Sequence, residues 1–303
     1  MMRIADRRLL IPAALLLLAG LAWLGWQFGA PPESMHRPAL WRIEKDGRHA
    51  YLFGTIHAVR RGEPWLTPAI ASALDRSDRL YLEVTGLDAE RSSHAIFERL
   101  GRSPGLPRIE ARLPADDSAH LRTLRARHPA ELRQLDGYES WAAALVVSAA
   151  ASSDLLLSAD DAPEAVLARR FEQAGKPVLG LETIEGQLGL FDRLPEPDQR
   201  DLLVQSVREA HDAARLYGEL HEAWAGGDLA RLESQFLTPL AQSPVLWRTL
   251  VDQRNRRWAR LLDRDLSEGS GTAFVAVGAG HLLGEDSLQA RLTELGWRVE
   301  RIE

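Results

Sequence analysis

Two short segments near opposite ends of the chain share one pattern, and this pattern constrains the fold more than any other feature. Each segment is an apolar run of strand length that reaches a glycine, with a histidine three residues further on: Tyr51-Leu-Phe-Gly-Thr-Ile-His57 and Phe274-Val-Ala-Val-Gly-Ala-Gly-His281. The pattern predicts a buried strand, then a glycine (Gly54 or Gly278) that lets the backbone turn or approach another segment closely. The imidazole then lies at the carboxyl end of its strand.

Similar segments follow both histidines. After His57 come a helical stretch over 68–74 and a strand over 79–84, and after His281 come a helical stretch over 286–295 and a strand over 297–302. We therefore expect a mixed α/β (α+β) domain built from two pseudo-repeated strand–GxxH–helix–strand halves around a central cleft. Asp46-Gly47 predicts a hairpin that leads into the first of these strands.

A large helical insertion separates the two halves. Residues 89–175 are rich in Ala, Leu and Arg, and apolar residues spaced by three and four predict single helices over 198–225 and 244–266. Arg254 falls on the apolar face of the last of these helices, so it requires a carboxylate or a ligand as its partner. Other histidines in predicted helices are interpreted as surface residues: His94, His120, His128, His211 and His221.

The N-terminus predicts a membrane anchor. Residues 1–8 include Arg7 and Arg8, and residues 9–28 form an uncharged, apolar stretch long enough to span a bilayer. Arginines before the span place residues 1–8 in the cytoplasm, which predicts a single-pass protein of the bacterial inner membrane with its main domain periplasmic or otherwise extracytoplasmic. A long cleaved signal peptide is the alternative. Residues 29–38 are a Pro-rich linker to a domain over 39–303.

Composition excludes several classes of function. The chain has no cysteine, which rules out disulfides, thiolate metal ligands and a cysteine nucleophile. Its net charge is −6, and it has no basic cluster with interleaved aromatic residues. Nucleic acid is therefore not expected as a partner.

The chemistry is expected where strands end. His57, Glu83, Glu182 and His281 are each predicted at or near the carboxyl end of a core strand, the edge at which α/β sheets bind ligands. Two imidazoles with one or two carboxylates suit a divalent transition metal such as Mn²⁺, Co²⁺ or Zn²⁺. The same atoms also suit a metal-free site with a His–Glu general base. The alternatives without a functional role are that Glu83 lies on a solvated strand face and that Glu182 belongs to an acidic cluster at a helix N-terminus.

Six blocks of sequence, in order, resemble the TraB/GumN family, which includes the PrgY-type proteins and is related to the TIKI Wnt proteases. The blocks start with Leu40-Trp-Arg-Ile, the segment ending in His57, and Leu82-Glu83. They continue with 175–188, Arg254-Asn255 and 278–284, so that the resemblance covers roughly 39–303. It implies a fold similar to that of the erythromycin-esterase and ChaN-like proteins.

The resemblance also implies site residues. The TIKI relatives are metal-dependent proteases that depend on the two GxxH histidines and the glutamate after the first, which correspond to His57, His281 and Glu83 here. Glu182 then serves as a fourth ligand or general base, and Arg254 stabilises an oxyanion or anchors a substrate carboxylate. Asn255 belongs to a further family motif.

The expected function is that of a membrane-anchored, exported metallohydrolase, with a peptidase acting on a short extended peptide as its narrower form. The competing expectation is a non-catalytic envelope protein that captures a peptide or small ligand in the same cleft. An inactive relative kept as a structural partner is a third.

Overall fold

The computed structural model describes residues 36–85, 90–237, 240 and 242–303. Its centre is a six-stranded mixed sheet in the order β6-β4-β7-β2-β1-β8. The strands of this sheet are β1 (Leu40–Lys45), β2 (Arg48–Thr55), β4 (Arg79–Val84), β6 (Val178–Glu182), β7 (Ala273–Gly278) and β8 (Arg298–Arg301). A two-stranded sheet pairs β3 (Val59–Arg60) with β5 (Leu157–Ser158).

The two GxxH strands, β2 and β7, are parallel neighbours in this sheet, with Tyr51 opposite Phe274. From β2 the chain passes through α1 (Pro68–Asp75) to β4, on the far side of β7. From β7 it passes through α13 (Leu288–Glu294) to β8, beyond β2 and β1. The two similar units therefore interleave in one sheet, and this arrangement brings their glycines and histidines to the same edge.

The strand β1 runs antiparallel to the rest, because it forms a hairpin with β2 and also pairs with β8. Asp46 and Gly47 form the hairpin turn with φ values of 50° and 75°. Positive φ at both central residues is what a tight two-residue hairpin requires, and Asp-Gly supplies it readily. The hairpin prediction is confirmed.

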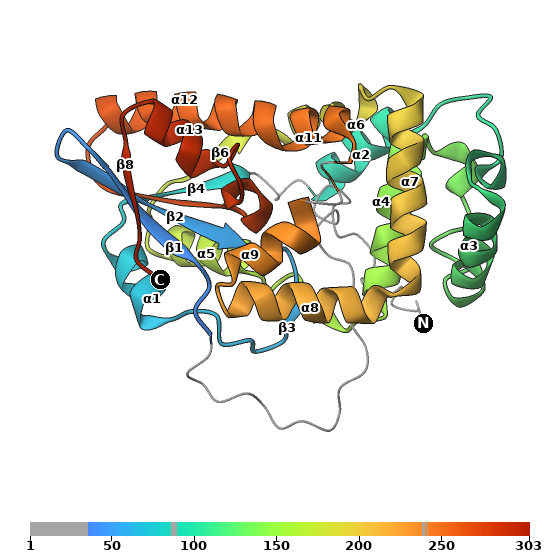
Figure 1. Cartoon of the computed structure of the whole chain (residues 1–303), viewed down its shortest axis with the longest axis horizontal. Coiled ribbons are helices and arrows are strands. Elements are labelled where there is room, and N and C mark those ends of the chain that lie inside the picture. The colour runs from blue at the N-terminus through green and yellow to red at the C-terminus, as the bar shows by residue number, and fades with distance from the viewer. Residues whose placement is uncertain (1–35, 86–89, 238–239, 241) are drawn as a thin grey trace, which may run out of the picture.

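Helices cover both faces of the sheet (Figure 1). Alternation along β7 divides its side chains, so that Phe274 packs with α1, α5 (Pro163–Gln173) and α8 (Ala213–Ala225). Its neighbour Val275 packs on the opposite face with α12 (Gln253–Glu268) and α13. This two-sided burial explains why the GxxH strands read as continuous apolar runs.

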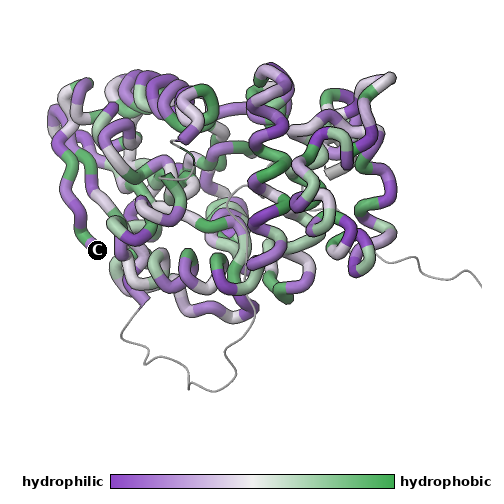
Figure 2. The backbone as a smooth tube through the Cα atoms, turned by 45° about the vertical axis from the view of Figure 1, so that its right-hand side comes forward, coloured by the Kyte–Doolittle hydropathy of each residue, from purple (hydrophilic) through white to green (hydrophobic). Residues whose placement is uncertain are grey.

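A helical layer extends the molecule beside the sheet and has its own core around Trp141 (Figure 1). It includes α2 (Glu90–Gly101), α3 (Ala115–Arg127), α4 (Ser140–Ser153), α6 (Ile184–Asp192) and α7 (Glu196–His211). In Figure 2 hydrophilic and hydrophobic residues alternate along the outer helices, as expected of amphipathic elements. The remaining helical elements are η4 (Ile109–Arg112), η5 (Leu135–Gly137), α9 (Leu229–Leu232), η6 (Glu233–Leu237), α11 (Pro244–Trp247), η7 (Arg248–Asp252) and η8 (Ala279–Leu282).

The mixed α/β class with a large helical insertion is confirmed, but two helix predictions need correction. The helix expected over 198–225 breaks at Asp212 (φ −108°, ψ 26°), so α7 and α8 diverge sharply (Figure 1). The helix expected over 244–266 is α11, a π-helical segment η7 and α12 in succession. Two helical histidines expected at the surface, His128 and His221, are buried beside Asp154 and Glu63.

The predicted anchor over 9–28, residues 1–8 and most of the predicted linker lie outside the described residues. Within the part of the chain that the structure describes, no helix has the length and apolarity needed to cross a membrane. This finding contradicts the prediction of a single-pass inner-membrane protein with a periplasmic domain, and that prediction is not kept.

Candidate functional site

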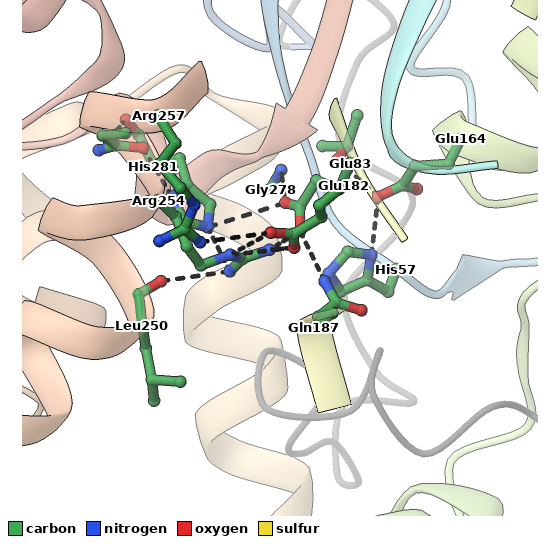
Figure 3. A network of polar contacts seen from close by, with 12 residues as sticks. His57, Glu83, Glu164, Glu182, Gln187, Leu250, Arg254, Arg257, Gly278 and His281 are labelled. Carbon is green, nitrogen blue, oxygen red and sulfur yellow. Dashed lines mark hydrogen bonds and ion pairs between the residues drawn. The ribbon is translucent and has the colours of Figure 1, made fainter. Parts of the chain in front are cut away.

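Five polar side chains meet at the carboxyl edge of the parallel strands. His57 follows β2, His281 follows β7, Glu83 lies near the end of β4, and Glu182 ends β6. Arg254 reaches the same point from α12, and each of the five side chains is 7–12% exposed. Figure 3 shows the guanidinium of Arg254 beside His281 and the two glutamates, with His57 near Gln187 and Glu164. The structure thus brings the residues singled out from sequence to one place.

Arg254 is the centre of this group, and every N–H of its guanidinium has an acceptor. Nη2 donates to Glu83 Oε2 and Glu182 Oε1, both at 2.6 Å, and Nε donates to Glu182 Oε1 at 3.1 Å. Nη1 donates to the Leu250 carbonyl at 3.2 Å and to His281 Nε2 at 2.9 Å. The guanidinium has five N–H groups, so none is left for a ligand in this arrangement. The expectation that Arg254 needs a carboxylate partner is confirmed twice over.

The arginine fixes the charges of its two carboxylate partners differently. Burial alone would raise the pKa of Glu83, but the charge of Arg254, with the Gly278 N–H, outweighs it and lowers that pKa to about 2. Burial dominates at Glu182 and raises its pKa, and Arg254 offsets this only in part. With both carboxylates ionised, Arg254, Glu83 and Glu182 together carry one net negative charge.

His281 is held as a neutral imidazole. Arginine has no acceptor, so Nε2 of His281 must accept from Arg254, and Nδ1 must then carry the proton, which it donates to Asn255 Oδ1 at 2.8 Å. The amide nitrogen of Asn255 donates to the carbonyls of His281 (3.2 Å) and Asp286 (2.8 Å), which fixes the orientation of the amide. Burial and the adjacent guanidinium lower the pKa of His281 to about 3.

His57 has the opposite character. Its Nδ1 lies 2.7 Å from Glu164 Oε1, an ion-pair distance, although the ring N–H does not point directly at the oxygen. Thr55 Oγ1 donates to the same oxygen at 2.6 Å. Burial would lower the pKa of His57, but Glu164, together with the charge of Glu83, outweighs burial and raises it above the usual 6.5. A proton on Nδ1 leaves the lone pair of Nε2 as the basic position of this ring.

The backbone around both histidines permits this convergence. Gly54 allows close approach, because a Cβ there would lie 3.2 Å from the Ala279 backbone. Gly278 donates its N–H to Glu83 Oε1 at 2.7 Å. A Cβ at Gly280 would overlap the ring of Phe236. The π-helical segment η7 precedes α12 directly, and π-helical turns shift the register of the side chains that follow, here Arg254 and Asn255, both buried.

The predicted metal ligands can be compared with what a divalent ion requires. An ion would need the lone pair of His281 Nε2 and an oxygen of Glu83, but Arg254 already donates to both. The second oxygen of Glu83 accepts the Gly278 N–H. Among the residues that the structure describes, no group of three or more His, Asp or Glu is arranged to hold a metal. As arranged, these side chains do not fit a divalent ion, because a guanidinium already serves as their cation.

Sequence reasoning did not identify three residues of this site. Glu164 holds His57, Gln187 donates to Glu83 Oε2 at 3.1 Å, and Trp258 packs against His281 with ring centroids 4.5 Å apart. In the sequence Glu164 looks like an ordinary acidic residue in the first turn of a helix, directly after a proline. Gln187 follows Glu182 within a block already noted, and that proximity was the only signal for it.

Comparison with known proteins gives a consistent assignment. The model of the TraB/PrgY/gumN family matches residues 39–301. YbaP of Shigella flexneri and YbaP of Escherichia coli K12, both described as uncharacterized, are each 26% identical over 245 residues, which is 81% of this chain and 88% of theirs. No solved structure gives a significant match. The chain belongs to the TraB/PrgY/gumN family.

Proposed function

We propose that this protein is a hydrolase that splits an ester or amide bond with water, with His57 as its general base. The observation that carries the proposal is the His57–Glu164 contact of 2.7 Å, at the edge where Glu83, Glu182 and Arg254 meet. A carboxylate on Nδ1 orients the ring and stabilises the imidazolium that forms when Nε2 takes a proton from water.

The contrast between the two GxxH histidines supports this assignment. Active sites often push the pKa values of similar groups apart so that each has one role. The pKa of His57 lies above 6.5, and that of His281 lies at about 3. The raised pKa of His57 suits a group that accepts a proton, whereas His281 stays neutral and serves as a fixed acceptor for Arg254.

Arg254 acts in this proposal as a positioning residue. Its engaged N–H groups hold Glu83, Glu182 and His281 in place, so the oxyanion role expected from sequence would require one of those bonds to break. Arg257 is a nearby cation that is open to solvent, with its side chain 44% exposed and Nη2 3.8 Å from Glu182 Oε2. We assign to Arg257 the contact with a negatively charged part of the substrate.

Two expectations from sequence stay open to the same experiment. Dependence on Mn²⁺, Co²⁺ or Zn²⁺ remains a prediction, which requires Arg254 to release His281 and Glu83. The non-catalytic binding protein remains the competing class. The general-base chemistry proposed for His57 does not require a metal ion.

The test is hydrolysis of p-nitrophenyl acetate, p-nitrophenyl butyrate and fluorescein-labelled casein by the full chain, with EDTA or with added Mn²⁺, Co²⁺ or Zn²⁺. His57→Ala should lose about 10²–10⁴-fold in kcat/KM, the usual contribution of a general base. His94→Ala, an exposed histidine on α2, is the matched control and should behave as wild type. Full activity of His57→Ala would refute the base, and activity only with added metal would refute the metal-free mechanism. Ligand retention with no turnover would favour the binding class.

A further inference from the structure

The two edges of the central sheet are unlike each other. The edge strand β8, Arg-Val-Glu-Arg over Arg298–Arg301, carries the charges with which proteins commonly block strand pairing. The other edge strand, β6, reads Val-Leu-Gly-Leu-Glu over Val178–Glu182 and has no charge before its last residue. Leu179 is 37% exposed, so this apolar edge is not fully covered.

The register of β6 identifies the backbone groups that point outward. Leu80 N–H donates to the Pro177 carbonyl at 3.0 Å, and β4 and β6 are parallel. In a parallel ladder, the N–H and C=O of one residue point to the same side of the strand, and those of the next residue point to the opposite side. The backbone groups of Leu179 therefore point toward β4, whereas those of Val178 and Gly180 point outward. Among the described residues, β6 is the last strand on this side of the sheet, so no strand pairs with the outward N–H and C=O groups of Val178 and Gly180.

The outward edge of β6 is continuous with the candidate site. β6 ends at Glu182, whose carboxylate contacts Arg254 at 2.6 Å and Arg257 at 3.8 Å. A further strand would lie about 4.8 Å from β6, so its residues would pass next to Glu182 as they reach the carboxyl edge. Gly180 is half-buried, and Thr85 lies where a Cβ at Gly180 would be.

We propose that the β6 edge binds an extended peptide segment as a seventh strand and leads it over the carboxyl edge of the sheet toward His57. Main-chain hydrogen bonds to Val178 and Gly180 hold the segment, as in other cases of strand addition. A carboxylate on the segment, from a side chain or from its own C-terminus, pairs with Arg257. Binding at β6 is independent of turnover, and the role of the segment as substrate rests on the hydrolase function proposed above.

The test uses Val178→Pro in the His57→Ala background, which removes one outward N–H and leaves the bonds to β4 in place. Proline is tolerated at such edge positions, and Val178→Ala is the matched control because it loses the side chain and keeps the N–H. The probe is a fluorescein-labelled pool of randomised ten-residue peptides rich in Val, Thr and Glu, read by fluorescence anisotropy. Val178→Pro should bind about fivefold more weakly than Val178→Ala, which corresponds to about 1 kcal/mol for one hydrogen bond.

A second measurement needs no protein variant at β6. Peptides enriched from the pool are N-methylated at one backbone position at a time, and their binding to the His57→Ala chain is measured. A matching pool with a C-terminal amide shows whether the carboxylate that pairs with Arg257 is the peptide C-terminus or an acidic side chain. Strand addition predicts loss of binding at every second position. The proposal would be overturned if Val178→Pro and Val178→Ala bind the peptides equally, or if no peptide binds. It would also be overturned if the loss of binding on N-methylation does not recur at every second position, or if light scattering shows a dimer that Val178→Pro disrupts. Peptide binding at β6 without hydrolysis by wild type would overturn only the proposed function.

Discussion

Replacement of Arg254 by methionine tests the arrangement of the site most severely. The side chain is 9% exposed and donates to two carboxylates that are 12% and 10% exposed. Arg254→Met keeps much of the buried length but leaves Glu83 and Glu182 without their cation. Loss of one partner of a buried ion pair typically costs about 3–5 kcal/mol, because the remaining charge is uncompensated.

Arg257→Met is the matched control on the same helix. Arg257 is 44% exposed, and its 3.8 Å contact with Glu182 is long for an ion pair. Its loss should therefore change the free energy of unfolding by about 0.5 kcal/mol or less. Urea unfolding at pH 7, followed by circular dichroism, measures both variants. Arg254→Met should be less stable than Arg257→Met by at least about 2.5 kcal/mol.

The double variant Arg254→Met, Glu182→Gln shows whether the loss arises from stranded charge. Glutamine removes one of the two unpaired carboxylates, so the double variant should be more stable than the sum of the two single changes predicts. Couplings between contacting residues are typically about 0.5–3 kcal/mol. If Arg254→Met unfolds within 1 kcal/mol of Arg257→Met, or if the changes are additive, the buried ion-pair account is refuted.

Three further predictions follow from the same contacts. Glu164→Gln should lower the pKa of His57, so the acid limb of the kcat/KM profile should move to lower pH as the rate falls; an unchanged limb would disprove the pairing. Gly280→Ala should cost about 1–3 kcal/mol in urea unfolding and be partly rescued by Phe236→Leu, whereas a neutral change would contradict the packing. Because the pKa of His281 falls to about 3 on folding, the unfolded chain binds more protons, and stability should fall by about 1 kcal/mol from pH 6 to pH 5. His281→Gln should lack this decrease.

The sequence predicts which residues lie at the carboxyl ends of the strands better than it predicts the contacts that their side chains make. Apolar runs that end in Gly54 and Gly278 are sufficient to place His57 and His281 at strand ends, because two-sided burial leaves little else for such runs to form. Alternation along β4 left the direction of Glu83 open, and its bond to the Gly278 N–H, one strand away, shows that it turns toward the site.

The partner of His57 depends on a contact that local sequence does not encode. Glu164 reaches His57 across more than one hundred residues, beside a two-residue pairing of β3 with β5. Such short strands carry no periodicity that a sequence pattern could reveal. The hydrogen bonding of every N–H of Arg254 likewise depends on the meeting of three strands and one helix. The sequence therefore predicts that Arg254 has a carboxylate partner, but not the number of its partners.

The opposite characters of the two GxxH histidines are the central claim, and their titration measures it without any substrate. The imidazole Cε1–H resonances of His57 and His281, assigned with His57→Ala and His281→Gln, are followed by NMR from pH 4 to pH 9. The account predicts a midpoint above 6.5 for His57 and no titration of His281 in this range, since its pKa is about 3. A midpoint near 6.5 for both rings, or His281 titrating above His57, would contradict it.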